Sequence, residues 1–220
     1  MSKALEFSVS DLSIHDGETL GQVCVEPRLL PLVPEIQLYL LPDAYPSESV
    51  SAQEYFDLMA QPPYWAFCWG GGQALARYLL DNPVITNGLT VVDLGAGSGV
   101  AGIAAGLAGS KRIVAVDIDP KALRACIHNS RLNNVILDAV TTIPKTYDLL
   151  LAADICYEEA GFDLIRETLA AGKKVLVAES RIPNLESQIP ELAHVASYKI
   201  KTFPDLDESS CFESVNVYLS

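Results

Sequence analysis

The residues best suited to chemistry form a glycine-rich turn that follows an apolar run. Residues 90–94 include Asp93, and Gly95, Gly97 and Gly99 follow at alternate positions. Glycine lets a backbone turn tightly and approach a ligand closely. The small, apolar stretch after the turn predicts a helix whose first N–H groups face the bound ligand. The spacing is not the dinucleotide fingerprint G-x-G-x-x-G, because Val100 stands where that motif needs glycine.

A second acid follows the glycine turn by about twenty residues. The apolar run 112–117 ends in Asp117, and an acid at this place suits hydrogen bonds to ribose hydroxyls. Alone, Asp117 would equally fit a strand-end acid that caps the next turn. The combined pattern resembles the first motif of Rossmann-like S-adenosylmethionine (SAM) methyltransferases. That resemblance implies SAM as the cofactor, with Asp93, Gly95, Gly97, Gly99 and Asp117 as cofactor-binding residues.

Asp154 and Tyr157 follow another apolar run, 147–153. In open α/β sheets, ligands bind outside the carboxyl ends of the strands at the point where strand order reverses. Runs 90–94 and 147–153 would flank that point, so Asp154 and Tyr157 are the candidate catalytic residues beside a methyl group. A carboxylate also favours a protonated amine, so positioning is the preferred role of Asp154. The alternative is that Asp154 caps the next helix and Tyr157 packs in the core.

An aromatic segment precedes the glycine turn. Both tryptophans lie within residues 61–72, together with Tyr64 and Phe67. Aromatic faces stack on bases or attract cations. Trp69 precedes three glycines and is assigned to the cofactor pocket, whereas packing between the N-terminal residues and the core fits Trp65 and Phe67 at least as well.

Alternating strands and helices must position these residues, which predicts an α/β fold with a mostly parallel sheet. The expected strands are 90–94, 112–117, 135–140, 147–153, 174–179, 195–202 and 214–219. The expected helices begin with one from Gly71 to residue 81 and continue with 99–108, 120–133, 161–171 and 184–193. The last two strands should form an antiparallel hairpin. Residues 1–60, with a strand at 6–14 and a helix at 52–59, are expected to form an N-terminal cap on a methyltransferase domain at 61–220.

Composition narrows the class of protein. The formal net charge of −13 disfavours a nucleic-acid partner. No apolar stretch is long enough for a bilayer, and the first residues lack a signal-peptide core, so neither a membrane partner nor secretion is expected. Five dispersed cysteines and three dispersed histidines predict no metal site and no disulfide framework. A reduced, cytoplasmic chain is the expectation.

Residues 62–66, Trp69 and 71–83 resemble the electron transfer flavoprotein β-subunit lysine methyltransferases, a family of seven-β-strand protein methyltransferases in the methyltransferase-16 group. Residues 34–38, 117–120 and the acid–aromatic pair Asp154 and Tyr157 fit as well. The resemblance implies a Rossmann-like class I fold and a lysine-bearing protein substrate, the electron transfer flavoprotein β subunit. Gly70 and Cys156 depart from the family pattern. The segment after Asn134 is short, so Asp138 is the candidate residue on the adenine side.

Three alternatives remain open at this stage. One is a nucleic-acid N-methyltransferase, since residues 61–64 superficially match the catalytic tetrapeptide of that class. Another is a small-molecule N-methyltransferase. The third is a non-catalytic SAM-binding partner protein that uses its N-terminal cap as an interaction surface. The sequence does not determine the oligomeric state.

Overall fold

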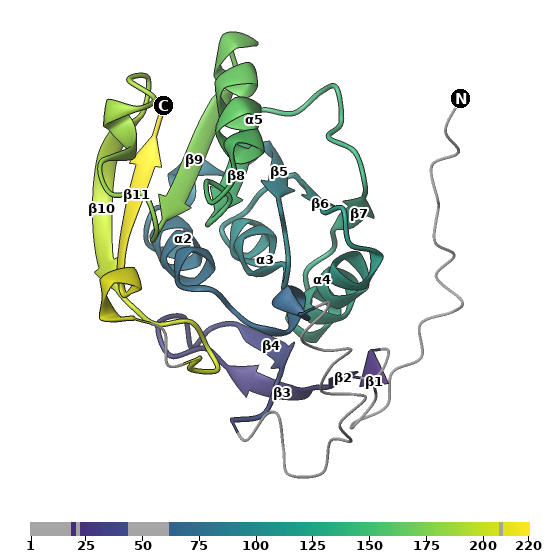
Figure 1. The fold of residues 1–220 in the computed structure, drawn as a ribbon. Coiled ribbons are helices and arrows are strands. Elements are labelled where there is room, and N and C mark those ends of the chain that lie inside the picture. The colour runs from purple at the N-terminus through teal and green to yellow at the C-terminus, as the bar shows by residue number, and fades with distance from the viewer. Residues whose placement is uncertain (1–18, 21–22, 44–61, 207–208) are drawn as a thin grey trace.

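A seven-stranded sheet forms the centre of the molecule in the computed structural model, which describes residues 19–20, 23–43, 62–206 and 209–220 (Figure 1). Its strand order is β10-β11-β9-β8-β5-β6-β7. The bounds are β5 (Thr90–Leu94), β6 (Arg112–Val116), β7 (Asp138–Val140), β8 (Leu149–Ala153), β9 (Lys174–Glu179), β10 (Ala193–Lys199) and β11 (Ser214–Leu219). Only β11 runs against its neighbours, since it pairs antiparallel with both β9 and β10. The mostly parallel sheet and its C-terminal hairpin confirm the predicted fold.

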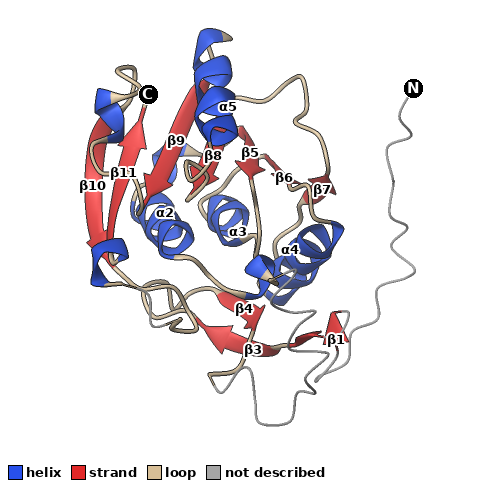
Figure 2. Cartoon of the chain, viewed as in Figure 1, coloured by secondary structure: helices blue, strands red, loops and turns tan. Residues whose placement is uncertain are grey.

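Helices cover both faces of the sheet (Figure 2). On one face lie α2 (Gly70–Asp81), α3 (Val100–Leu107) and α4 (Pro120–Leu132), and on the other lies α5 (Glu159–Ala170). Neighbouring residues of β5 show the alternation: Val91 packs with α2 and α3, whereas Val92 packs in the cluster that contains α5. Burial on both faces explains why the strands read as continuous apolar runs.

A short hairpin from the N-terminal region completes the core. Strands β3 (Glu26–Leu29) and β4 (Gln37–Leu40) pair antiparallel, and β1 (Thr19–Leu20) pairs with β2 (Val23–Cys24). Leu38 and Leu40 share the core cluster of α2 and α3. Asn129 of α4 accepts a hydrogen bond from Tyr39 N at 2.7 Å, which fastens β4 to that helix. The expected strand at 6–14 and helix at 52–59 lie outside the described residues.

The predicted helix at 184–193 is wrong. The structure has only a 3₁₀ turn there, Leu185–Ser187, and Asn184 before it has a left-handed φ of 58°. Pro190 explains the difference, because a proline within a helix removes a donor and clashes with the preceding turn.

Several strand boundaries also move, most of all in β7 and β10. The expected strand at 135–140 is shortened to β7, because Val135 N still donates to Ser130 O at the end of α4. The expected strand at 195–202 ends at Lys199, after which Phe203 and Cys68 pair in an isolated antiparallel bridge. Within the described residues, no helix is both long and apolar enough to cross a membrane.

Candidate functional site

The glycine turn lies at the carboxyl end of β5 and uses backbone conformations that favour glycine. The φ angles of Gly95, Gly97 and Gly99 are +64°, +52° and +82°. A Cβ on Gly97 would meet nothing closer than Gly95 O at 3.9 Å, so space lies open beside it. At Gly99 a Cβ would come within 3.2 Å of Cys126 in α4. The middle of the turn therefore leaves room for a ligand, while its end allows close helix packing.

Asp117 meets the glycine turn from the neighbouring strand. Its Oδ2 accepts a hydrogen bond from Gly97 N at 2.9 Å, and its Oδ1 accepts one from Asp119 N at 2.9 Å. Asp119 in turn accepts from Lys121 N and caps α4. Asp117, directly after β6, thus links the glycine turn to the turn that begins α4. A carboxylate offers about four acceptor positions, so these two bonds leave capacity for a ligand hydroxyl.

Asp93 binds the helix that follows the glycine turn. It is buried, and its Oδ2 accepts a hydrogen bond from Gly102 N at 2.8 Å in the first turn of α3. Burial raises the pKa of Asp93 to about 7, helped by the nearby charge of Asp117 and opposed by the Gly102 bond. The structure therefore places Asp93 as a cap for α3 rather than on the open side of the turn.

Asp154 is held by donors from two other elements. Its Oδ2 accepts from Gly71 N at 2.7 Å, and its Oδ1 accepts from Ser180 N at 2.9 Å and Ser180 Oγ at 2.7 Å. Gly71 lies in the first turn of α2, so Asp154 caps that helix and not α5, which follows it in sequence. Burial raises the pKa of Asp154, while the bonds from Ser180 and Gly71 and the charge of Arg181 lower it.

The segment after Asp154 is fastened to β9 by a buried acid. Glu179 accepts from Cys156 N at 3.1 Å and from Arg181 N at 3.0 Å. Burial raises the pKa of Glu179 to about 6, and the charge of Asp154 adds to this. Tyr157 is 67% exposed, so it does not pack in the core. It lies three residues after Asp154, in the segment that joins β8 to α5.

Trp69 lies at the start of α2 among other rings. Its indole N–H donates to Tyr64 O at 3.0 Å, and the Tyr64 ring lies 5.9 Å away, centroid to centroid. The Arg181 guanidinium lies 5.9 Å from the Trp69 ring and 4.6 Å from that of Phe212. Trp65 is 2% exposed and packs in a core cluster with Val25 and Leu41, the hydrophobic packing considered for it.

The adenine-side assignment of Asp138 needs correction. Asp138 begins β7 and pairs with Val114, two residues before the carboxyl end of β6. Its carboxylate forms an ion pair with Arg112, the first residue of β6, at 2.7 Å. The short segment before β7 thus leaves Asp138 away from the glycine turn. Ile118, which was not among the predicted site residues, is 92% exposed directly after Asp117. An apolar residue directly after a strand-end acid is the signal in the sequence that could have marked it.

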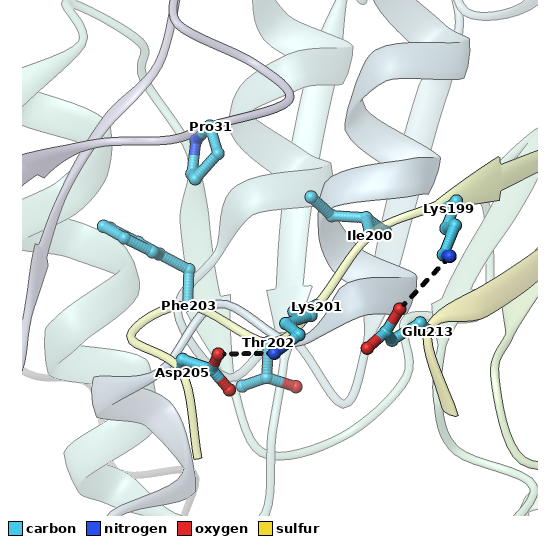
Figure 3. A pocket seen from close by; sticks show the side chains of 8 residues that line it. All are labelled: Pro31, Lys199, Ile200, Lys201, Thr202, Phe203, Asp205 and Glu213. Carbon is cyan, nitrogen blue, oxygen red and sulfur yellow. Dashed lines mark hydrogen bonds and ion pairs between the residues drawn. The ribbon is translucent and has the colours of Figure 1, made fainter. Parts of the chain in front are cut away.

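A cavity of about 430 Å³ lies elsewhere, between the loop after β3 and the segment after β10 (Figure 3). Two ion pairs border it, Lys199 with Glu213 at 3.7 Å and Lys201 with Asp205 at 2.7 Å. None of the predicted site residues lines this cavity. Across the described ranges, no group of three or more His, Cys, Asp or Glu side chains is placed to hold a metal ion.

Comparisons with known proteins bear on the fold and the family of this chain. Residues 73–164 match the family model of ribosomal protein L11 methyltransferase (PrmA). Among solved structures, the ribosomal protein L11 methylase of Lactobacillus delbrueckii subsp. bulgaricus has a TM-score of 0.50 at 21% identity, covering 68% of this chain and 78% of that one. The 16S rRNA N2 G1207 methyltransferase (RsmC) of T. Thermophilus has a TM-score of 0.55 at 13% identity, covering 88% and 49%. At such identities these likenesses establish the fold, which is Rossmann-like.

Sequence relatives are more specific. The electron transfer flavoprotein beta subunit lysine methyltransferase of Rattus norvegicus is 37% identical over 180 residues, 74% of this chain and 69% of the relative. The same enzyme of Danio rerio is 41% identical over 148 residues, 60% of this chain. The chain spans 57% of the Danio rerio protein's length. On the coverage and identity of the rat relative, this chain belongs to the family of electron transfer flavoprotein β-subunit lysine methyltransferases.

Proposed function

We propose that this protein transfers a methyl group from SAM to a lysine amine of a protein, and that the electron transfer flavoprotein β subunit is the acceptor. One observation carries the proposal. The carboxyl ends of β5 and β8, which are neighbours in the sheet, bring the glycine turn and Asp117 to the same edge as Asp154 and Tyr157. A cofactor site and an acceptor site on adjacent strands are what a methyl transfer needs. The names of the relatives support lysine as the acceptor.

The residues at this edge fit SAM. The open space beside Gly97 admits a ligand against the backbone, and Asp117 has acceptor capacity for ribose hydroxyls. Ile118, exposed directly after Asp117, and Trp69, at the start of α2, offer apolar surface for the cofactor. When bound, SAM supplies an electrophilic methyl group. The residues that would hold it are Gly95, Gly97, Asp117, Ile118 and Trp69.

The chain's own task is to orient the acceptor. Attack by an amine on a methyl carbon is a direct displacement, so its rate depends mainly on holding the reacting atoms close and in line. The amine must be neutral, and a lysine with an ordinary pKa of about 10.4 is mostly protonated at pH 7. The Asp154 carboxylate accepts a hydrogen bond from the amine and orients it. Since a negative charge favours the protonated amine, water takes the proton, and Asp154 is a positioning group.

The test is methylation by the purified protein with labelled SAM. Three acceptors are offered separately: purified electron transfer flavoprotein β subunit, total RNA and DNA, and a metabolite extract. Label on a lysine of the flavoprotein subunit, located by mass spectrometry, is the expected result. Label on nucleic acid or on a small amine alone would contradict the proposal, and binding of SAM without any transfer would indicate the non-catalytic alternative.

A further inference from the structure

Ser180 places two donors on a single oxygen of Asp154. It follows β9 directly, and both its N–H and its hydroxyl point at Oδ1, at 2.9 and 2.7 Å. The other oxygen, Oδ2, accepts from Gly71 N at 2.7 Å. A carboxylate has about four acceptor positions, two on each oxygen. Among the contacts of the described residues, Oδ1 is saturated and Oδ2 keeps one position.

The other contacts that hold Asp154 in place involve the backbone. Asp154 has a left-handed φ of 51°, and its own N–H donates to Ala178 O at 2.9 Å. A Cβ on Gly71 would collide with the Asp154 carboxylate, so the close approach of α2 requires glycine there. The Ser180 hydroxyl is therefore the side-chain donor in this set, and the one that a substitution can remove without changing the backbone.

We propose that Ser180 is a positioning residue, which saturates Oδ1 of Asp154 and so directs the remaining acceptor position of Oδ2 to the methyl-acceptor amine. The inference rests on the proposed function, and it adds a residue to the acceptor side of that site. Without the hydroxyl, Oδ1 regains a position, and the amine has two oxygens to choose from. The in-line geometry on which displacement depends would then be populated less often.

Charged and titratable groups around Asp154 determine how loss of the Ser180 hydroxyl would change the pKa of Asp154. Glu179 and Arg181 flank Ser180 on the β9 side, Cys156 follows Asp154 in its own loop, and Cys68 precedes α2. The negative charge of Glu179 disfavours an ionised Asp154, whereas Arg181 and the Ser180 bonds favour it. Removal of the hydroxyl therefore raises the pKa of Asp154.

The experiment compares Ser180→Ala with Ser180→Thr, which keeps the hydroxyl, and with Ser197→Ala, which removes an exposed serine hydroxyl bonded to Asn216 on the β10–β11 hairpin. We expect kcat of Ser180→Ala to fall tenfold or more with an unchanged Kd for SAM. The acid limb of its kcat–pH profile should move to higher pH. Ser180→Thr should regain most of kcat, and Ser197→Ala should match the wild type.

A second readout is independent of turnover. Carbon-13 NMR of the Asp154 carboxyl, assigned by its loss in Asp154→Asn, gives the pKa directly, and that pKa should rise in Ser180→Ala and not in Ser180→Thr. An unmoved pKa, or a kcat that stays at the wild-type value, would overturn the role of Ser180. Absence of protein methylation by the wild type would instead overturn the proposed function, so the two failures are distinguishable.

Discussion

At the scale of single residues, three acids at the carboxyl ends of strands each accept a hydrogen bond from a backbone N–H group of another segment. Asp93 accepts from Gly102 in α3, Asp117 from Gly97 in the glycine turn, and Asp154 from Gly71 in α2. The sequence marks such acids, because each follows an apolar run. It does not show which N–H each one meets, since Gly71 and Asp154 are 83 residues apart. Only the folded chain reveals that a helix cap and a candidate site residue are the same carboxylate.

Asp154→Ala tests both roles of that carboxylate. Turnover should fall about a hundredfold or more, the scale seen when a polar group at a reacting centre is removed. The Kd for SAM should change little, because Asp154 contacts α2 and Ser180 rather than the glycine turn. Unfolding free energy should also drop by about 1 kcal/mol, since α2 loses its cap. A variant with a lower melting temperature and full activity would leave Asp154 as a cap alone.

The cofactor side is tested at Gly97 and Asp117. Gly97→Arg should abolish SAM binding by filling the open space beside the turn. Gly88→Arg is the matched control, because Gly88 also has a positive φ and open surroundings but lies before β5.

Asp117→Ala should weaken the binding of SAM by about 1.5–3 kcal/mol, typical of a hydrogen bond to a charged group. Calorimetry that returns wild-type affinity for both variants would place the cofactor elsewhere.

At the scale of elements, the sequence was most informative where apolar runs are long. The bounds of β5, β9 and β11 match the expected strands, because each is a short apolar run with turn residues beside it. Segments whose structure depends on a single residue were harder to predict. Pro190 disrupts the helix that was expected at 184–193. The hydrogen bond from Val135 N to Ser130 O, just after α4 ends, shortens the strand that was expected to bring Asp138 to the site.

Asn129 of α4 joins β4 to the glycine turn, a connection that no pattern in the sequence indicated. It is fully buried, accepts from Tyr39 N of β4 at 2.7 Å and donates to Ser98 O of the glycine turn at 2.8 Å. Asn129→Ala should lower the unfolding free energy by about 2–4 kcal/mol, since one partly buried N–H and one buried carbonyl lose their partner. Denaturation in urea measures this. Asn82→Ala, which removes one partly buried bond at the end of α2, should cost much less; equal losses would contradict the account.

At the scale of the whole molecule, buried acids make stability depend on pH in an unusual direction. The pKa of Asp93 is raised from 3.8 to about 7, so the folded state binds the proton more tightly than the unfolded state. Its contribution to stability is therefore complete below about pH 4 and is lost as the pH rises to about 7. The magnitude is on the order of 4 kcal/mol. Glu179, with a pKa of about 6, acts in the same direction.

Asp93→Asn should flatten this dependence, because an amide oxygen still accepts from Gly102 N and carries no charge at any pH. Urea unfolding at pH 5, 6, 7 and 8 measures the slope. Glu167→Gln removes the same charge from an exposed position on α5 and controls for the overall acidity of the chain. If both variants change the slope equally, repulsion across the acidic surface, and not the buried carboxyl, sets the dependence.

The place of β11 in the sheet also constrains the order of events on the ribosome. β11 lies between β9 and β10, although it follows both in the sequence. Residues 216–219 supply the partners for 176–179 of β9. Until they emerge during translation, β9 exposes a row of unsatisfied backbone groups along one side, the kind of edge that recruits other strands. A nascent chain of this protein therefore carries β9 as an open sheet edge until β11 inserts beside it.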